Sequence, residues 1–229
     1  MCSFGVNDFF AVGCRDSRRR ICAFFAKYSR SMNIIFDVGM VLADFRWREY
    51  CRELGISDEH TKLLAERMIE DPIWNEFDLA IIPPQILIDK LEKRFPECKA
   101  DFRLFWKDIT RLVLPFDYSA GWIERLKAQG HKVFLLSNYP GFMFDIHSKN
   151  FGFMDKIDGK VVSYEYHIMK PAHEIYQLLM KKYGLEPSEC IFIDDRPINI
   201  AGAEECGIKG IVFTGYEDAS AKLDALING

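Results

Sequence analysis

Short apolar runs recur along the chain and helix-like stretches separate them. Three of the runs, residues 33–36, 132–136 and 190–193, end in small, polar or acidic residues, and residues 208–213 form a further run. Runs of this kind are typical of parallel strands buried on both faces. Helical patterns at residues 121–129 and 174–183 are each followed by a glycine that can close a helix. This alternation predicts an α/β fold with a doubly wound, Rossmann-like parallel sheet.

Residues 45–115 break this alternation. The segment is rich in Glu, Lys, Leu and aromatic residues, and four prolines punctuate it: Pro72, Pro83, Pro84 and Pro96. This composition predicts several short helices. Inserted after the first strand, they would lie over the carboxyl ends of the strands, where α/β sheets bind ligands. We therefore expect a core domain of residues 32–44 and 116–229, and a small α-helical cap domain of residues 45–115 whose aromatic side chains form its own core.

The first 31 residues differ from the rest, because they carry six basic and two acidic residues. A secretory signal places its positive charges before an apolar stretch, but here one apolar stretch precedes the arginines and the next is short. The pattern therefore argues against a signal peptide. A helical targeting or membrane-surface segment is one alternative. We favour a basic N-terminal extension, residues 1–31, that lies upstream of a start at Met32 and outside the fold.

The overall composition limits the functional classes. With 229 residues, 49% of them hydrophobic, the chain can bury one large core or a core with a small appended domain. A net charge of −4 gives no overall basic surface for nucleic acid, and the apolar runs are shorter than the ~20 residues that cross a bilayer. Seven scattered cysteines are typical of reduced thiols. We expect a cytoplasmic protein with no nucleic-acid partner and no membrane span; the sequence does not indicate its oligomeric state.

The first apolar run ends in Asp37, and Gly39 follows two residues later. A strand would deliver the carboxylate of Asp37 to its carboxyl end, where the chain turns sharply. A carboxylate held in this way can act as a nucleophile or a metal ligand, or it can merely cap a turn. This segment alone does not distinguish between these interpretations.

Three later segments place polar groups at similar positions. Ser137 and Asn138 follow the second strand, and both side chains can donate to a phosphoryl oxygen, although such pairs are also common in turns. Lys170 precedes a proline and a predicted helix, which puts one ammonium group at a rigid turn. Asp194 and Asp195 end the third strand. Two adjacent acids there are costly unless a cation lies between them, so we expect a bound Mg²⁺.

The order of these segments, an aspartate, a serine, Lys-Pro and then Asp-Asp, resembles the haloacid dehalogenase-like superfamily of hydrolases. The resemblance covers the chain from Met32 to about its C-terminus, and it looks closest to the branch that includes bacterial α-glucose-1-phosphate phosphatase. It implies a Mg²⁺-dependent phosphatase that acts on a small phosphorylated metabolite, with a sugar phosphate as the expected substrate. The reaction would pass through an aspartyl-phosphate intermediate.

The resemblance also implies a role for each candidate residue. Asp37 would be the nucleophile. Ser137 and Asn138 would bind the transferring phosphoryl group, and Lys170 would neutralise the charge of the nucleophile and the phosphate. Most of the rate enhancement would then come from positioning and charge neutralisation.

The metal site that the resemblance implies comprises Asp37, the backbone carbonyl of Gly39 and Asp194, with Asp195 contributing directly or through water. Gly39 also departs from the family pattern, because related phosphatases carry an aspartate there that acts as general acid and base. Loss of a general acid typically lowers a rate ~10²–10⁴-fold. Two explanations stay open: the enzyme prefers good leaving groups, such as anomeric sugar, acyl or aryl phosphates, or a residue of the cap supplies the proton.

Two alternative functions differ in their chemistry. A haloacid dehalogenase-type hydrolase of the same fold would also use Asp37 as nucleophile but needs no metal, so the acid pair at 194–195 argues against it. A non-catalytic phosphate-binding protein would keep the fold without an acid at Gly39. Among the histidines, His173 is expected to lie nearest the phosphate. Arg196 could brace the acid pair or bind substrate.

Overall fold

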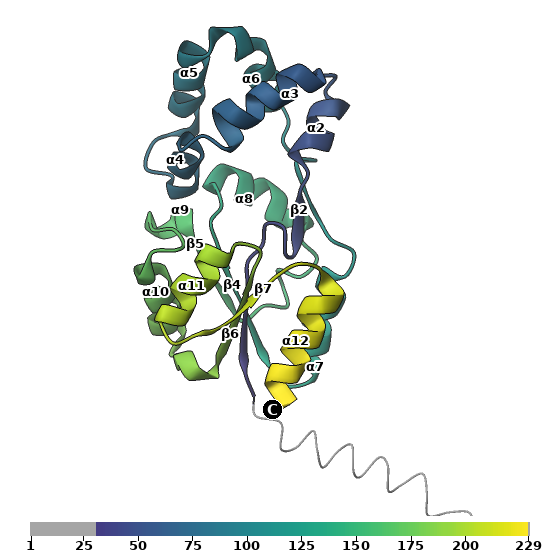
Figure 1. Ribbon diagram of the computed structural model, residues 1–229, viewed down its shortest axis with the longest axis vertical. Helices are drawn as coiled ribbons and strands as arrows, with labels where there is room; N and C mark the ends of the chain where they lie inside the picture. Colours follow the sequence, from purple (N-terminus) through teal and green to yellow (C-terminus); the bar gives the residue numbers. More distant parts are fainter. Residues whose placement is uncertain (1–30, 229) are drawn as a thin grey trace, which may run out of the picture.

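A five-stranded parallel sheet forms the centre of the molecule (Figure 1). The computed structural model describes residues 31–228, so the extension expected at the N-terminus lies, except for its last residue, outside the described residues. The strands follow the order β5-β4-β1-β6-β7, and each neighbouring pair is parallel. Their bounds are Asn33–Phe36 (β1), Lys132–Ser137 (β4), Gly159–Val162 (β5), Cys190–Asp194 (β6) and Lys209–Val212 (β7). The sheet winds outward from β1 in both directions, which confirms the predicted doubly wound α/β fold.

Helices cover both faces of this sheet, because successive side chains of a strand point to opposite sides. Ile34 and Phe36 pack into one cluster with helices α7 (Ser119–Ala128) and α12 (Tyr216–Asn228), and the ring of Phe36 meets that of Trp122 edge-on. Ile35 packs into the other cluster with α10 (His173–Tyr183) and α11 (Pro197–Glu205). Burial on both sides explains why the interiors of the central strands are apolar.

A helical insertion, residues 46–112, leaves the sheet after β1 and returns before β4. Strands β2 (Ala43–Phe45) and β3 (Val113–Pro115) pair antiparallel at its base. Its helices are α2 (Trp47–Glu53), α3 (Asp58–Leu64), the π-helical turn Ala65–Ile69, α4 (Ile73–Leu79), α5 (Pro84–Arg94), the 3₁₀ turn Pro96–Cys98 and α6 (Lys99–Phe105). In Figure 1 these helices form a separate group at one end of the sheet. None of the helices within residues 31–228 is long and apolar enough to cross a membrane.

Local signals account for several element boundaries. Helix α3 begins after Ser57, whose hydroxyl accepts a hydrogen bond from the backbone N–H of His60. Helix α10 ends at Gly184, which adopts a left-handed conformation with a φ of 63°. The remaining short elements are α8 (Gly141–His147), the 3₁₀ turns Ser148–Asn150 and Pro187–Glu189, and α9 (Ser163–Tyr166).

The insertion is tied to the core through α4 and α9. The hydroxyl of Ser163 donates to the carbonyl of Asp78 at 2.6 Å and accepts from the backbone N–H of Tyr139 at 3.0 Å. His167 Nδ1 lies 2.7 Å from the carbonyl of Leu79, to which it donates. These contacts hold the C-terminal end of α4 against the loop that follows β4.

Candidate active site

Asp37 lies at the carboxyl end of β1, where its backbone N–H donates to the carbonyl of Ile193 on the adjacent strand. Its side chain is buried, with 8% of the residue exposed. The carboxylate oxygen Oδ1 accepts from the backbone N–H of Val38 and from the hydroxyl of Ser137, each at 2.7 Å. Lys170 Nζ lies 3.0 Å from the same oxygen. Three donors thus fix the plane of the carboxylate and leave Oδ2 for a ligand.

Lys170 is a fully buried lysine at the centre of this arrangement. Its Nζ contacts Asp37, donates to Asp194 Oδ2 at 2.6 Å and donates to the carbonyl of Leu136 at 2.9 Å. Burial lowers the pKa of Lys170, but the carboxylates of Asp37 and Asp194 outweigh burial and raise it above its ordinary value. The side chain is therefore an ammonium group at neutral pH, and all three of its N–H bonds are occupied.

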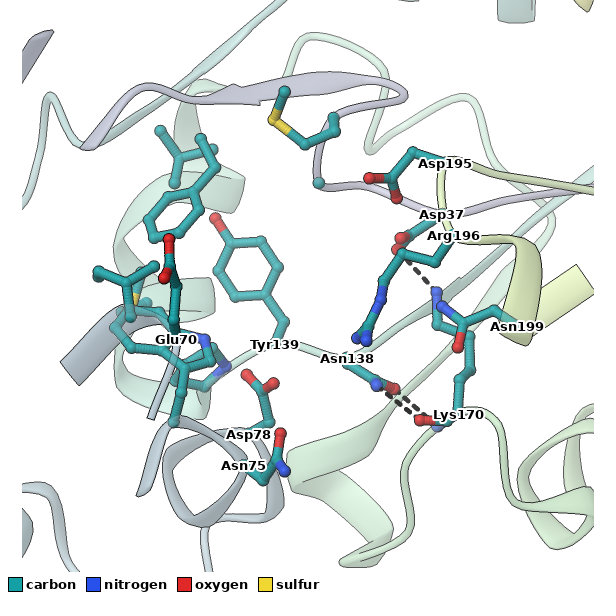
Figure 2. Close-up of a pocket in the computed structure, with 18 of the residues that line it drawn as sticks. Asp37, Glu70, Asn75, Asp78, Asn138, Tyr139, Lys170, Asp195, Arg196 and Asn199 are labelled. Atoms are coloured by element: carbon teal, nitrogen blue, oxygen red, sulfur yellow. Dashed lines mark hydrogen bonds and ion pairs between the residues drawn. The ribbon is translucent and has the colours of Figure 1, made fainter. Parts of the chain in front are cut away.

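The side chain of Asn138 holds the backbone of Lys170. Its Oδ1 accepts from the backbone N–H of Lys170 at 2.8 Å, and its Nδ2 donates to the carbonyl of Lys170 at 3.0 Å (Figure 2). Both ends of the amide are thus engaged in positioning the lysine, a role that the sequence did not indicate. The phosphoryl contact expected for Asn138 stays a prediction, and so does that of Ser137, whose hydroxyl is bonded to Asp37.

Three acids converge beside Lys170. Carboxylate oxygens of Asp37, Asp194 and Asp195 lie within 4.8 Å of one another. Asp194 is fully buried, and its Oδ1 accepts from the backbone N–H of Arg196 at 2.8 Å and from the side chain of Asn199 at 3.0 Å. The structure thus brings together the acids that the sequence placed at the ends of two different strands.

The electrostatics of this cluster fit a divalent cation. Burial raises the pKa of Asp37, an effect that Lys170 opposes and Asp194 reinforces. Burial and the charge of Asp194 also raise the pKa of Asp195. Three carboxylates against one buried ammonium group leave an excess of negative charge, and oxygen ligands in this number and spacing suit Mg²⁺. Asp37, Asp194 and Asp195, with the carbonyl of Gly39, would hold the ion.

A cavity of about 470 Å³ opens over these groups and is lined from both the core and the helical insertion. The core contributes Asp37, Gly39, Asn138, Tyr139, Lys170, Asp195, Arg196 and Asn199 to its lining. The insertion contributes Ile69, Glu70, Asp71, Trp74, Asn75 and Asp78. Its wall is therefore mixed, with an apolar part and a polar part, as is typical of small-molecule sites.

Asp78 also lines the cavity, although the sequence did not indicate a role for it. Only 6% of it is exposed, and its Oδ1 has no hydrogen-bond partner among the described residues. Trp74, Asn75 and Asp78 all line the cavity, and their i, i+1, i+4 spacing places them on one face of α4. That spacing is visible in the sequence, but nothing in the sequence shows that this face meets the core.

His173 and Arg196, two further residues expected near the acid pair or the phosphate, differ in their position relative to the cavity. His173 does not line the cavity; it is half-exposed, and its Nε2 lies 2.6 Å from Glu205 Oε2, so its expected position nearest the phosphate is wrong. Helix α10 starts close to Lys170 in sequence, but the side chain of His173 turns toward α11. Arg196 braces Asp194 through its backbone, while its side chain extends into the cavity (Figure 2).

His147 and Tyr139 form a buried pair behind the cavity. Burial lowers the pKa of His147, so its imidazole is neutral near pH 7. Nε2 lies 2.6 Å from the carbonyl of Ile109, which can only accept, so Nε2 carries the proton. Nδ1 therefore accepts from the hydroxyl of Tyr139 at 2.9 Å. The proton of Tyr139 is thus directed away from the cavity.

The fold and the acid cluster together define a hydrolase built on a carboxylate at the end of a central parallel strand. The model of the haloacid dehalogenase-like hydrolase family matches residues 34–207. The chain belongs to this family, which confirms the resemblance drawn from its four short segments. Its expected place in the branch with α-glucose-1-phosphate phosphatase stays a prediction.

The chain is similar to several characterised members. It is 25% identical to a sesquiterpene phosphatase of Aspergillus oryzae, over 79% of this chain and 88% of the relative. It is 26% identical to a D-ribitol-5-phosphate phosphatase of Bacteroides thetaiotaomicron, over 86% of this chain and 98% of the relative. A haloacid dehalogenase family enzyme of the same bacterium, solved with magnesium and inorganic phosphate, superposes with a TM-score of 0.66 at 25% identity and covers 84% of this chain and 98% of its own.

Proposed function

We propose that this protein is a Mg²⁺-dependent phosphatase that hydrolyses a small phosphorylated metabolite through an aspartyl-phosphate intermediate. The observation that carries the proposal is the convergence of Asp37, Lys170, Asp194 and Asp195, with Asp37, Lys170 and Asp195 lining one cavity. Two phosphatases among the relatives and a solved neighbour with magnesium and phosphate support it. The protein would occupy the cytoplasm, as its cysteine pattern predicts.

Each polar residue of the core would have a separate role in the reaction. Asp37 attacks the phosphorus atom of the substrate, and its carboxylate is held in one plane by Val38, Ser137 and Lys170. Lys170 carries a fixed positive charge that offsets the nucleophile and the incoming phosphate. When bound, Mg²⁺ would supply the remaining positive charge between the acids and the phosphoryl oxygens. Asn199 would maintain this set by orienting Asp194.

The helical insertion, within the expected cap domain of residues 45–115, would close the cavity over the leaving group. Glu70 and Asn75 face the cavity beside Trp74 and Ile69, so this wall can meet hydroxyl groups as well as apolar surface. A sugar phosphate is the substrate class that we favour, because the polar residues can pair with its hydroxyls while Trp74 covers a face of the ring. Arg196 would contact the phosphate or its neighbouring hydroxyl from the core side.

Hydrolysis of para-nitrophenyl phosphate and of a panel of sugar phosphates tests the proposal. We expect phosphate release that requires Mg²⁺, stops with EDTA and is lost in Asp37→Asn. Asp117→Asn, which removes an exposed carboxylate of the core, is the matched control and should behave as the parent protein does. Activity that survived Asp37→Asn would disprove the role of the nucleophile.

The same assay separates the two alternatives. Halide release from a 2-haloacid in the presence of EDTA would identify a dehalogenase. A protein that binds inorganic phosphate with Mg²⁺ but releases none from any ester would be a binding protein. Trapping with beryllofluoride and Mg²⁺ gives an independent check, because an aspartyl-phosphate enzyme forms a stable adduct at Asp37.

A further inference from the structure

Asp78 presents a buried carboxyl group to the reacting side of the cavity. It is 6% exposed, its Oδ1 has no hydrogen-bond partner among residues 31–228, and it lines the same cavity as Asp37 and Lys170. Figure 2 shows the carboxyl group directed into the space beside Tyr139 and Asn138. A buried polar atom without a partner is costly in a folded protein. Its retention here points to a partner that arrives with the substrate.

The position of Asp78 relative to Asp37 is set by the core. The carbonyl of Asp78 accepts from Ser163, and Ser163 in turn accepts from the backbone N–H of Tyr139. Tyr139 follows directly on Ser137 and Asn138, and Ser137 is bonded to Asp37. A short chain of hydrogen bonds and backbone therefore connects the backbone of Asp78 to the carboxylate of Asp37.

The core supplies no acid at the position where related phosphatases carry one. Gly39 has no side chain, and a Cβ atom added to it would meet nothing within 4 Å. The space beside Asp37 is therefore open on this side. The group that protonates the leaving oxygen must come from another element that faces the same space.

Three other proton-bearing side chains of the cavity wall, those of Tyr139, Lys170 and Arg196, do not supply this proton. The hydroxyl proton of Tyr139 is directed to His147. The three N–H bonds of the Lys170 ammonium point at Asp37, Asp194 and the carbonyl of Leu136. An arginine guanidinium does not act as a general acid, which excludes Arg196. Asp78 combines a free carboxyl oxygen with a position that faces the reacting groups.

We propose that Asp78 is the general acid and general base of this hydrolase, replacing from the helical insertion the acid that Gly39 lacks. The inference rests on the proposed phosphatase function and deepens it. In the first step Asp37 bonds to phosphorus, the bond from phosphorus to the ester oxygen breaks, and that oxygen takes its electron pair and the proton of Asp78. In the second step a water attacks the aspartyl-phosphate, its proton passes to Asp78, and the bond between Asp37 and phosphorus breaks to release phosphate.

The charges that face Asp78 agree with this cycle. Burial and, to a smaller extent, the charge of Asp37 raise the pKa of Asp78 to about 8, although Lys170 and Arg196 act in the opposite direction. The carboxyl group therefore holds a proton at neutral pH before substrate binds. An acid with a pKa near the working pH can both give and regain a proton within one turnover.

Asp78→Asn with para-nitrophenyl phosphate and benzyl phosphate tests the inference, because only the second ester has a leaving group that needs a proton. With para-nitrophenyl phosphate we expect a burst of nitrophenolate at nearly the parent rate, followed by slow turnover as the aspartyl-phosphate accumulates. With benzyl phosphate we expect no burst and a kcat lower by ~10²–10⁴-fold. Asp78→Ala should give the same pattern, which provides a second variant if the asparagine form folds poorly.

Two further variants separate a chemical role from a structural one. Glu76→Gln removes an exposed carboxylate from the same helix and should leave both substrates unaffected. Gly39→Asp has open space at its Cβ atom, so in the Asp78→Asn background it should restore part of the activity on benzyl phosphate. In the parent background the same substitution should give no comparable gain, because Asp78 already supplies the proton.

The outcomes distinguish this inference from the function on which it rests. Parent protein that hydrolyses para-nitrophenyl phosphate with Mg²⁺, together with an Asp78→Asn variant of unchanged kcat on benzyl phosphate, overturns the role of Asp78 alone. An equal loss of the burst rate on both esters also overturns it, since that result indicates a structural role. Parent protein without Mg²⁺-dependent phosphatase activity overturns the proposed function and this inference together.

Discussion

Replacement of Lys170 by methionine probes the electrostatics that the whole site depends on. The methionine keeps most of the volume of the side chain and removes its charge and its three N–H donors. In the native protein Nζ lies 3.0 Å from Asp37 and 2.6 Å from Asp194, and the side chain is 1% exposed. At an effective dielectric constant of ~20, each attraction is about 5–6 kcal/mol before the cost of desolvation. Because the buried charges must be desolvated, the net loss on removing one partner is smaller, ~3–5 kcal/mol.

The loss of stability in Lys170→Met should depend on pH, and its direction follows from the pKa shifts of Asp37 and Lys170. The pKa of Asp37 is already raised in the folded protein, so its ionisation lowers stability as pH rises above the ordinary carboxyl pKa. Without Lys170 that pKa rises further. The pKa of Lys170 is also raised in the folded protein. The contribution of its protonation to stability is therefore constant at every pH below its pKa in the unfolded chain, which includes the neutral range. The Lys170→Met deficit should therefore be larger at about pH 8 than at about pH 5, where Asp37 can hold a proton.

Urea unfolding of the metal-free protein at both pH values measures this effect. Lys222→Met is the control, since Lys222 forms an exposed ion pair with Asp218 and its removal should change little at either pH. Addition of Mg²⁺ should recover part of the deficit at the higher pH. A Lys170→Met variant that is as stable as the parent protein at about pH 8 without metal, or whose deficit does not vary with pH, would refute the reasoning.

Three further predictions follow from the same geometry. Mg²⁺ should raise the Tm of the parent protein more at about pH 8 than at about pH 5, because Asp37, whose pKa burial raises to about 7, loses its proton over this range. Calorimetry that shows no shift at either pH would contradict the metal site. Asn199→Leu removes the side-chain amide that donates to both carboxylate oxygens of Asp194, and it should weaken Mg²⁺ binding ~10–100-fold in a titration of activity against metal. Unchanged Mg²⁺ binding would show that Asp194 keeps its orientation without Asn199. Ser163→Ala removes the hydroxyl that bridges Asp78 and Tyr139, and it should lower the free energy of unfolding in urea by ~1–3 kcal/mol. It should also lower kcat more for benzyl phosphate than for para-nitrophenyl phosphate. An equal loss on both esters would show that the bridge does not position Asp78.

The central part of the fold was predictable because its strands are buried on both faces. β1, β4 and β6 have apolar interiors and lead into polar residues at one edge of the sheet, so the sequence shows both their existence and where their ends point. β5 was missed. It is an edge strand of four residues that begins Gly159-Lys160, and only its last two residues, Val161 and Val162, are buried, which is too short an apolar run to indicate a strand.

In the candidate site, too, some residues were predictable from the sequence and others were not. Asp37, Lys170 and Asp194 were predicted because each lies at the end of a strand or the start of a helix of the core, where parallel topology brings such positions together. Asp78 and Ser163 belong to a contact between the insertion and the core. The relative placement of two packed units depends on surfaces from many segments, so no local pattern could have shown which face of α4 meets the cavity.

The charge balance of the closed site explains why a protonated Asp78 and a bound cation belong together. Asp37, Asp194 and Asp195 contribute three negative charges when ionised, and Lys170 offsets one of them. A divalent cation would offset the other two, so these four side chains and the cation would together carry no net charge when the phosphate arrives. A fourth ionised acid at Asp78 would oppose the dianion at the moment of binding, whereas its protonated form adds a hydrogen-bond donor and no charge. The substrate therefore favours the same protonation state of Asp78 that the leaving group requires, and the carboxylate appears only after the ester bond has broken, when an attacking water needs a base.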